Sequence, residues 1–149
     1  MTTAMLNEAD TAVSLCFLMT IDDEALGAFS SCEGLGCEVV LETREEGGNN
    51  FNVWQFPTRL KYPNIKLTRP LGKDTEKIAK WFSEMATGYK RRTGTIVAMG
   101  TDGREVAKWA LLDVIPVRWT GPSLTPDQPK VVTETIEIAH HGFLPAGSA

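Results

Sequence analysis

The residues best suited to acid–base chemistry are few, and their spacing does not favour it. The two histidines, His140 and His141, are adjacent at the end of a segment that predicts a strand. Neighbouring side chains of a strand point to opposite faces, so these two cannot bind one metal ion together. A general base would also need an orienting acid and a nucleophile beside it, and the sequence indicates neither. We therefore expect no catalytic histidine.

The cysteines and carboxylates do not predict a metal site either. Cys16, Cys32 and Cys37 form no C-x-x-C pair and have no histidines at zinc-binding spacing. We interpret them as small buried apolar residues in a reducing compartment. The run Asp22-Asp23-Glu24 could bind a cation in principle. Three consecutive carboxylates point in different directions, however, which favours a turn at the end of a strand.

Motifs for nucleotide or ester chemistry are missing from the sequence. It contains no G-x-S-x-G, no H-E-x-x-H and no P-loop. The G-x-G at 34–36 lacks the third glycine and the following helix of a dinucleotide site. A net charge of −4 argues against a general nucleic-acid binder. We therefore predict a protein that is not an enzyme and uses no cofactor.

Four tryptophans leave an alternative function open. Trp54, Trp81, Trp109 and Trp119 could line a sugar or base site. Trp81 belongs to the apolar face of a predicted helix, and Trp109 belongs to a predicted strand. These positions favour a role for the tryptophans in core packing or in a protein interface over a ligand site. The alternatives are a stand-alone β-barrel module that binds a small ligand through the tryptophans, and an enzyme built from scattered residues.

One segment has clear helical periodicity, DTEKIAKWFSEMATG at 74–88, and it predicts a helix over about 74–87. Asp74 can cap its start and Gly88 can end it in the left-handed conformation. The spacing i, i+3, i+4, i+7 defines a core face of Ile78, Trp81, Phe82 and Met85. The other side is charged, with Glu76, Lys77, Lys80 and Glu84. A helix of about 13 residues, ~20 Å long, cannot form a core alone, so it must lie against a sheet.

The remainder reads as about eight short strands, with the helix after the fifth. Asp102-Gly103 between two β-rich runs is the clearest hairpin signal. The sequence predicts a mainly β fold of the α+β class: a small antiparallel β-barrel or sandwich with one helix. We expect a single domain over 1–149 with flexible ends at about 1–10 and 144–149. The expected strands include 13–21, 28–33, 37–43, 51–56, 65–69, 104–112 and 131–140.

Polar residues without an apolar anchor follow the strand at 37–43. They are Glu45, Glu46, Gly47, Gly48, Asn49 and Asn50. Such a segment predicts a projecting loop that takes a fixed conformation only against a partner surface. Together with short strands whose edges invite pairing, it favours a sheet completed by other copies of the chain.

In order and spacing, several segments resemble the tail tube proteins of contractile phages and the inner tube proteins of extracellular contractile injection systems, which are similar in fold to the ring-forming tube protein of type VI secretion. The resemblance covers residues 13–143. The segments that carry it are Phe17–Ile21 with the acidic turn after it, FSSCEGL at 29–35, EGGN at 46–49, LTRPL at 67–71, Trp81-Phe82, and WALLDVIP at 109–116.

This resemblance implies a ring-forming tail-tube domain. Six-fold rings would stack into a hollow tube inside a contractile sheath, with joined sheets lining a channel for a cargo effector or DNA. The implied partners are other copies of the chain, the sheath protein, and baseplate and terminator proteins. The loop at 45–50 would reach neighbouring subunits, and the charged helix face would contact a subunit or the sheath. The net charge motivates the hypothesis of a polar and acidic channel surface.

No apolar run approaches the length of a membrane span. Residues 1–10 contain no basic stretch followed by an apolar core, so we expect no secretory signal there. We expect no membrane binding by the chain itself. Assembly is expected in the bacterial cytoplasm, as part of a phage tail or a released tail-like particle.

Overall fold

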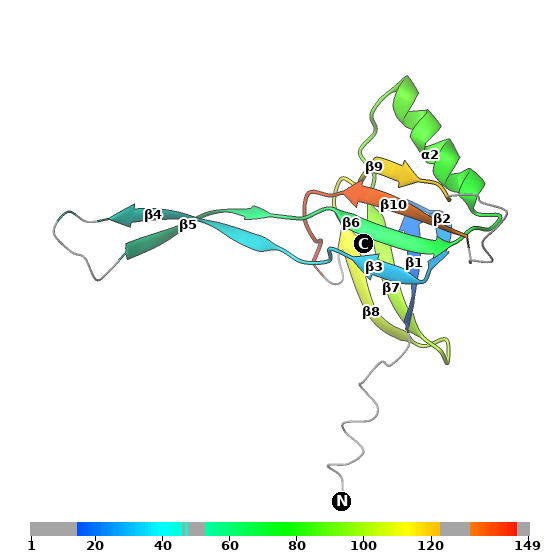
Figure 1. Ribbon diagram of the computed structural model, residues 1–149, viewed down its shortest axis with the longest axis horizontal. Helices are drawn as coiled ribbons and strands as arrows, with labels where there is room; N and C mark the ends of the chain where they lie inside the picture. Colours follow the sequence, from blue (N-terminus) through cyan, green and yellow to red (C-terminus); the bar gives the residue numbers. More distant parts are fainter. Residues whose placement is uncertain (1–14, 46, 48–52, 123–131, 146–149) are drawn as a thin grey trace, which may run out of the picture.

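A computed structural model describes residues 15–45, 47, 53–122 and 132–145 (Figure 1). Their elements form two packed antiparallel sheets, a separate two-stranded sheet and one helix. The elements are β1 (Leu15–Ile21), β2 (Glu24–Phe29), β3 (Ser31–Glu33), β4 (Glu38–Glu45), β5 (Val53–Lys61), β6 (Ile65–Pro70), α2 (Thr75–Thr87), β7 (Gly94–Gly100), β8 (Glu105–Leu111), β9 (Ile115–Thr120) and β10 (Thr133–Ala139).

Sheet A has the strand order β2-β1-β7-β8 and is antiparallel throughout. Its β1–β2 connection is the two-residue turn at Asp22-Asp23. The β7–β8 connection contains Asp102-Gly103, with Gly103 at φ 80°, a conformation that favours glycine. Both hairpins therefore follow the turn chemistry that the sequence indicates.

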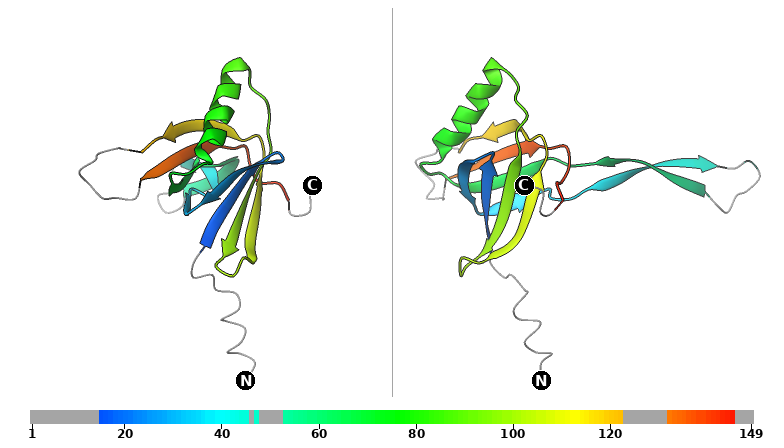
Figure 2. Two further views of the ribbon diagram at one scale, coloured as in Figure 1. Left: turned by 90° about the vertical axis from the view of Figure 1, so that its right-hand side faces the viewer. Right: turned by 180° about the vertical axis from the view of Figure 1, so that it is seen from behind.

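Sheet B has the order β3-β6-β10-β9 and packs against sheet A (Figure 2). The chain passes from one sheet to the other at Ser30, whose backbone N–H donates to the carbonyl of Thr68 at 2.8 Å. At the end of β10 the chain returns to sheet A, where Leu111 and Phe143 form a β-bridge. These two crossings tie the sheets together at their corners.

The core lies between the sheets and under the helix. Alternate residues of β6 and β10 point into it, which gives both strands the period of two typical of one covered face. Its buried apolar side chains are Met19, Ile21, Leu26, Phe29, Ile65, Leu67, Ile78, Trp81, Ile96, Leu111, Val114, Ile136 and Ile138. On α2, Ile78 and Trp81 are buried, Phe82 packs against the core, and Met85 is half-buried.

The predicted mainly β fold with one helix is confirmed, and its details differ in two places. The described chain has ten strands, and the helix follows the sixth. The prediction of about eight was low, partly because the segment 28–33 divides at Ser30 between two sheets. Strand β5 also extends beyond the expected end at residue 56, through Pro57 to Lys61. A register shift at Val40/Leu41 accommodates the proline in the two-stranded sheet.

The ends of α2 also differ from expectation. Asp74 holds the N-cap position, but its side chain makes no capping hydrogen bond and instead pairs with Lys77 at 3.2 Å. Gly88 follows the last helical residue with φ 154° and ψ 146°, outside the left-handed helical region. Among the described residues, no helix is long and apolar enough to span a membrane.

Strands β4 and β5 form a sheet of their own, which we call the arm. It extends away from the two packed sheets (Figure 1). Its strands pair from Glu38–Lys61 to Glu45–Val53. An isolated two-stranded hairpin is marginally stable in water, so the arm is the element most in need of a partner.

Candidate assembly surfaces

The arm exposes apolar side chains that the core would normally bury. Every residue of β5 is exposed. The large apolar side chains that the arm leaves in solvent are Val39, Leu41, Val53, Trp54, Phe56 and Leu60, at 46–54% of their full surface. Burying one such side chain is worth about 1.5–3 kcal/mol, so a partner that covers the arm gains substantial free energy. We predicted that the tryptophans, Trp54 among them, lie in the core or in a protein interface. Trp54 lies exposed on the arm.

The predicted loop at 45–50 begins at the last residue of β4 and ends before the first residue of β5 in the sequence. Of its residues, Glu45 ends β4 and Gly47 is exposed. The others, Glu46, Gly48, Asn49 and Asn50, lie outside the described residues. Strand β4 ends and β5 begins at the end of the arm that lies away from the two packed sheets (Figure 1).

Aromatic rings pack where the arm joins the packed sheets. Tyr62 directly follows β5, and its ring lies 5.3 Å from that of His140 and 5.8 Å from that of Phe143, centroid to centroid. The Nδ1 atom of His140 accepts the backbone N–H of Gly142 at 3.2 Å, while its Nε2 has no partner among the described residues. Burial lowers the pKa of His140. The carbonyl oxygen of Gly142, 3.4 Å from Nδ1, favours the protonated ring and opposes this lowering.

Gly34 fixes the other side of the arm's base. It has φ 95°, and a Cβ atom there would lie 2.2 Å from the backbone oxygen of Asn64. Only glycine permits this approach of two backbone segments. Of the two glycines at 34–36, Gly34 is therefore required by the close packing at the base of the arm.

A groove of about 480 Å³ separates α2 from β9. It is lined by Ile78, Ala79, Phe82, Ser83 and Trp119. Trp119 is 43% exposed, so its ring is available to a neighbour. Trp109, by contrast, is half-buried and packs against the core.

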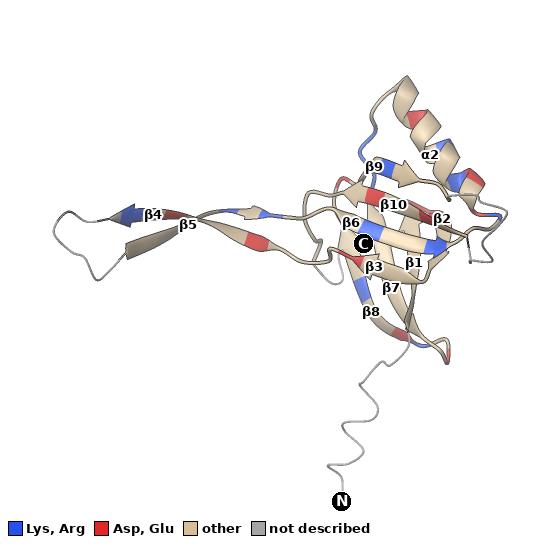
Figure 3. Ribbon diagram, viewed as in Figure 1, with Lys and Arg blue, Asp and Glu red and all other residues tan. Residues whose placement is uncertain are grey.

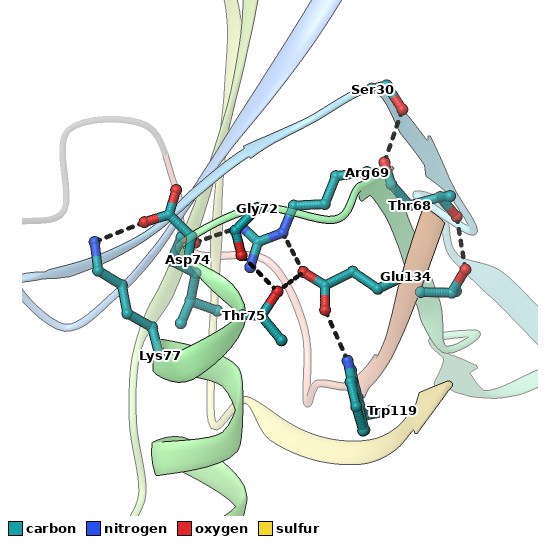
Figure 4. A network of polar contacts seen from close by, with 11 residues as sticks. Ser30, Thr68, Arg69, Gly72, Asp74, Thr75, Lys77, Trp119 and Glu134 are labelled. Atoms are coloured by element: carbon teal, nitrogen blue, oxygen red, sulfur yellow. Dashed lines mark hydrogen bonds and ion pairs between the residues drawn. The ribbon is translucent and has the colours of Figure 1, made fainter. Parts of the chain in front are cut away.

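A buried polar network lies beneath this groove (Figure 4). The Nε atom of Arg69 donates to Glu134 Oε1 at 2.7 Å, and Trp119 Nε1 donates to Glu134 Oε2 at 3.0 Å. Thr75, the first residue of α2, donates its hydroxyl to Glu134 Oε1 at 3.0 Å. The Nη1 atom of Arg69 donates to the carbonyl of Leu26 at 2.6 Å. One carboxylate thus joins β6, β9 and α2 to β10.

Sequence reasoning did not find this network, although a signal was present. Arg69 of β6 and Glu134 of β10 lie on the buried face of their strands, two positions from buried Leu67 and Ile136, respectively. Opposite charges at two core positions indicate a buried pair. Their register as direct partners is visible only in the folded sheet.

The predicted contact face of the helix is engaged in ion pairs within the chain. Lys77 pairs with Asp74, Lys80 pairs with Glu24 at 3.6 Å, and Glu84 pairs with Arg92. Glu76 is exposed in the first turn. Glu76 and Lys80 lie four positions apart, but they form no ion pair among the described residues. The exposed pairs of Lys77 and Lys80 contribute little to stability, so they can be exchanged for pairs with a partner, whereas the Glu84–Arg92 pair is partly buried.

We searched the described part of the chain for a metal-binding site and for buried cysteines. There, no three His, Cys, Asp or Glu side chains are arranged to hold a metal ion. The interpretation of all three cysteines as buried was wrong for Cys16 and Cys37, which are exposed. Cys32 is half-buried, and burial, with a smaller contribution from the Glu33 charge, raises its pKa to about 11. The thiol of Cys32 is therefore unreactive at neutral pH.

Solved structures share this fold over most of their length. The chain is similar to a chain of the sheath–tube complex of an extracellular contractile injection system, PVC, in the extended state, with a TM-score of 0.78 at 16% identity over 97% of each chain. It is similar to a chain of the anti-feeding prophage (AFP) baseplate, with a TM-score of 0.73 at 15% identity over 90% of this chain and 93% of the other. Hcp1 from Salmonella typhimurium gives a TM-score of 0.51 at 15% identity over 86% and 83%.

A sequence comparison with curated proteins gives no match. The family model described as T4-like virus tail tube protein gp19 matches residues 13–144, which is nearly the whole chain and includes both sheets, the arm and the helix. The protein therefore belongs to the T4-like tail tube protein family and is a structural tube subunit.

Proposed function

We propose that this tube subunit assembles into six-membered rings, which stack into the hollow inner tube of a contractile injection system or phage tail. The observation that carries the proposal is the arm. It projects from the body and leaves six large apolar side chains exposed over its two strands. A second copy of the chain supplies the surface that covers them. The six-fold symmetry is supported by the related AFP baseplate structure, which was six-fold symmetrised.

The partners of the tube follow from the assemblies in which similar chains occur. Those assemblies are a sheath–tube complex, a baseplate and a sheath/tube terminator. We infer a contractile sheath around the tube, a baseplate at one end and a terminator at the other. The particle forms in the bacterial cytoplasm and is part of a phage tail or a released tail-like particle. A cargo effector or DNA passes through the channel.

The charged face of α2 is proposed as the contact with the sheath or with a neighbouring subunit. Its residues Glu76, Lys77, Lys80 and Glu84 are exposed or half-buried and carry both signs of charge. Such a face pairs with a surface of mixed charge without a large desolvation cost. The loop at 45–50 is proposed as the assembly segment at the tip of the arm, and deleting Gly47 and Gly48 is expected to impair tube formation.

A stand-alone ligand-binding module is less well supported, because the family consists of tube proteins. The same membership supports a role without catalysis. Function is then mechanical: the stiffness of the tube comes from many contacts between subunits, each ring adding its interfaces to the next.

The test is negative-stain microscopy and sizing of the purified chain. The wild-type protein is expected to form rings or tubes. The double variant W54S/F56S removes two apolar contacts of the arm and is expected to remain smaller than a ring with an unchanged circular dichroism spectrum. V106S is the matched control, because Val106 is equally exposed but lies on β8, in sheet A. A wild-type chain that stays monomeric at high concentration contradicts the proposal.

A further inference from the structure

Two short connections join the arm to the packed sheets. Residues 34–37 lie between β3 and β4, and Leu35 among them packs against the core. Residues 62–64 lie between β5 and β6, and there the half-buried ring of Tyr62 packs against His140 and an aromatic neighbour. The arm is a sheet of its own, so the contacts at its base decide where it points.

The surface on which Tyr62 packs is held in place by backbone hydrogen bonds. It consists of residues 140–143, which follow β10. The N–H of His141 donates to the carbonyl of Leu112 at 2.8 Å, and the N–H of Leu112 donates to the carbonyl of Gly142 at 2.9 Å. A Cβ at Gly142 would lie 3.3 Å from the Tyr62 ring, so the ring rests on the backbone there. The segment 140–143 is therefore fixed, and Tyr62 is the side of the contact that is free to move.

His140 lies at the centre of this contact and is only 6% exposed. The centroid of its ring lies 5.3 Å from that of Tyr62 and 5.1 Å from that of Phe143. The N–H of Gly142 donates to Nδ1 at 3.2 Å, which places the proton of the neutral ring on Nε2. Nε2 is buried without a hydrogen-bond partner among the described residues. The site thus accommodates a neutral ring at the cost of one unsatisfied N–H.

A protonated His140 conflicts with this environment in two ways. The second proton, on Nδ1, faces the N–H of Gly142, so that hydrogen bond is lost and the acceptor left to Nδ1 is the Gly142 carbonyl at 3.4 Å. The positive charge also lies in a buried site where Nε2–H has no acceptor among the described residues. Burial accordingly lowers the pKa of His140. Because Tyr62 covers one side of the ring, moving Tyr62 away lets water solvate the cation.

The charges around His140 do not compensate its protonation. The titratable residues of the segments that meet there are Glu38, Lys61, Tyr62, Asp113, Glu137 and His141. Glu38 and Lys61 are direct partners of opposite charge at the base of the arm (Figure 3). His140 forms no ion pair among the described residues, and the charge of His141 lowers its pKa further. The Glu137 carboxylate accepts from Nδ2 of Asn64 at 3.2 Å, an exposed hydrogen bond that also holds the arm's base.

We propose that protonation of His140 separates the ring of Tyr62 from residues 140–143 and so frees the arm to change direction relative to the packed sheets. At neutral pH the ring is neutral and the arm keeps the direction seen in Figure 1. In mild acid an open arrangement, in which water solvates the imidazolium, becomes more populated. Assembly through the arm needs a fixed direction, so ring formation decreases as the pH falls. This last step rests on the proposed function.

The pH range of the movement follows from the two pKa values of His140. In the open arrangement the ring is in water and titrates near its usual pKa of 6.5, whereas burial lowers the pKa in the closed arrangement. The ratio of open to closed molecules therefore rises as the pH falls below 6.5, and it stops rising below the closed-state pKa. Between pH 7.5 and 5.5 the rise is at most about tenfold.

The distance between two spin labels reports the direction of the arm. The labels are placed at T43C on β4 and K108C on β8, both exposed positions. The full-length background removes the native cysteines and two assembly contacts of the arm through C16S, C32A, C37S, W54S and F56S. We expect a narrow distance distribution at pH 7.5 and a several-fold larger second population at pH 5.5. The control pair K66C and K108C lies within the packed sheets and is expected to stay narrow at both values.

Four variants assign the movement to the two rings. H140Q binds no proton and is expected to abolish the change between the two pH values, whereas H141Q is expected to keep most of it. Y62A removes the ring and is expected to open the arm at both values, while Y62F keeps the ring and is expected to behave like the labelled parent chain. The readout is the change with pH, so a variant that shifts the arm at both values still gives an answer.

Two results of the distance measurement overturn the inference. One is an arm distribution that does not change with pH, which would mean that the rings of Tyr62 and Phe143 hold the imidazolium in place. The other is an equal broadening of the control pair, which would mean that acid loosens the whole fold.

Ring yield at the two pH values connects the movement to assembly. With the native arm residues, negative-stain microscopy and sedimentation are expected to show fewer rings at pH 5.5 than at pH 7.5, and H140Q is expected to reduce this difference. Equal ring yields at both values, together with a changed arm distance, overturn the effect on assembly. A chain that forms no rings at either value overturns the proposed function, while the distance result still decides whether His140 controls the arm.

Discussion

Arg69 and Glu134 form an ion pair inside the protein, with Nε and Oε1 2.7 Å apart and side chains only 4% and 0% exposed. They are direct partners across β6 and β10. The guanidinium also lies over the ring of Phe29, 4.5 Å from its centroid, and the carboxylate accepts from Thr75 and Trp119. The pair thus fixes β9 and the start of α2 on the sandwich, because all of them share one carboxylate.

Replacing this carboxylate is expected to destabilise the fold severely. In E134A the guanidinium of Arg69 loses its buried counter-charge, and the indole N–H of Trp119 loses its acceptor. Breaking a buried pair by removing one partner costs about 3–5 kcal/mol. The free energy of unfolding, measured with urea, gives the value. The control is E137A on the same strand, whose side chain points outward, with an expected change of about 0.5 kcal/mol or less. Similar losses in both variants would contradict the assigned role.

The stability of the protein is expected to fall in mild acid because of His140. Burial lowers the pKa of His140 in the folded chain below its usual 6.5. The unfolded chain then binds a proton first as the pH falls, so the free energy of unfolding decreases below pH 6.5 and continues to decrease until the folded-state pKa is passed. Urea unfolding between pH 7.5 and 5 measures the slope. H140Q is expected to flatten this slope. H141Q removes only the smallest of the three influences on the pKa of His140 and is expected to change the slope little. An equal slope in wild type and H140Q would exclude His140 as the source.

Gly34 is expected to tolerate no side chain. In G34A the new Cβ would meet the Asn64 oxygen at 2.2 Å, and φ 95° is strained for alanine. The cost exceeds about 1 kcal/mol, because a backbone segment must move as well. The control is G36A, two residues along, where a Cβ meets nothing within 4 Å. Thermal unfolding compares the two, and ring yield reports whether the arm keeps its direction. A G34A protein as stable as G36A would refute the close approach.

The apolar face of α2 is expected to carry the attachment of the helix to the sandwich. Ile78 is 1% exposed in the core, so I78A leaves a cavity and costs about 2–5 kcal/mol. E76A, two residues earlier and exposed, is the control, with an expected change below about 0.5 kcal/mol. Urea midpoints separate the two variants. Should I78A unfold at the wild-type midpoint, the helix would not be held by this face.

The helix, the turns at Asp22-Asp23 and Asp102-Gly103 and the mainly β class could be predicted from the sequence, because each depends on periods and turn residues within a few positions of one another. The stripe of Ile78 and Trp81 and the Asp102-Gly103 turn are of this kind. The order and spacing of several segments carried the resemblance to tail tube proteins in the same way. These features depend on local sequence and not on tertiary contacts.

Tertiary structure alone decided the division of 28–33 between two sheets, the separation of the arm, and the partners of Arg69 and Glu134, which are 65 positions apart in the chain. It also placed the ring of Tyr62 against that of His140. The physical reason is register: a strand shows by its alternation which residues share a face, but which residue lies opposite which depends on long-range pairing that no local period encodes.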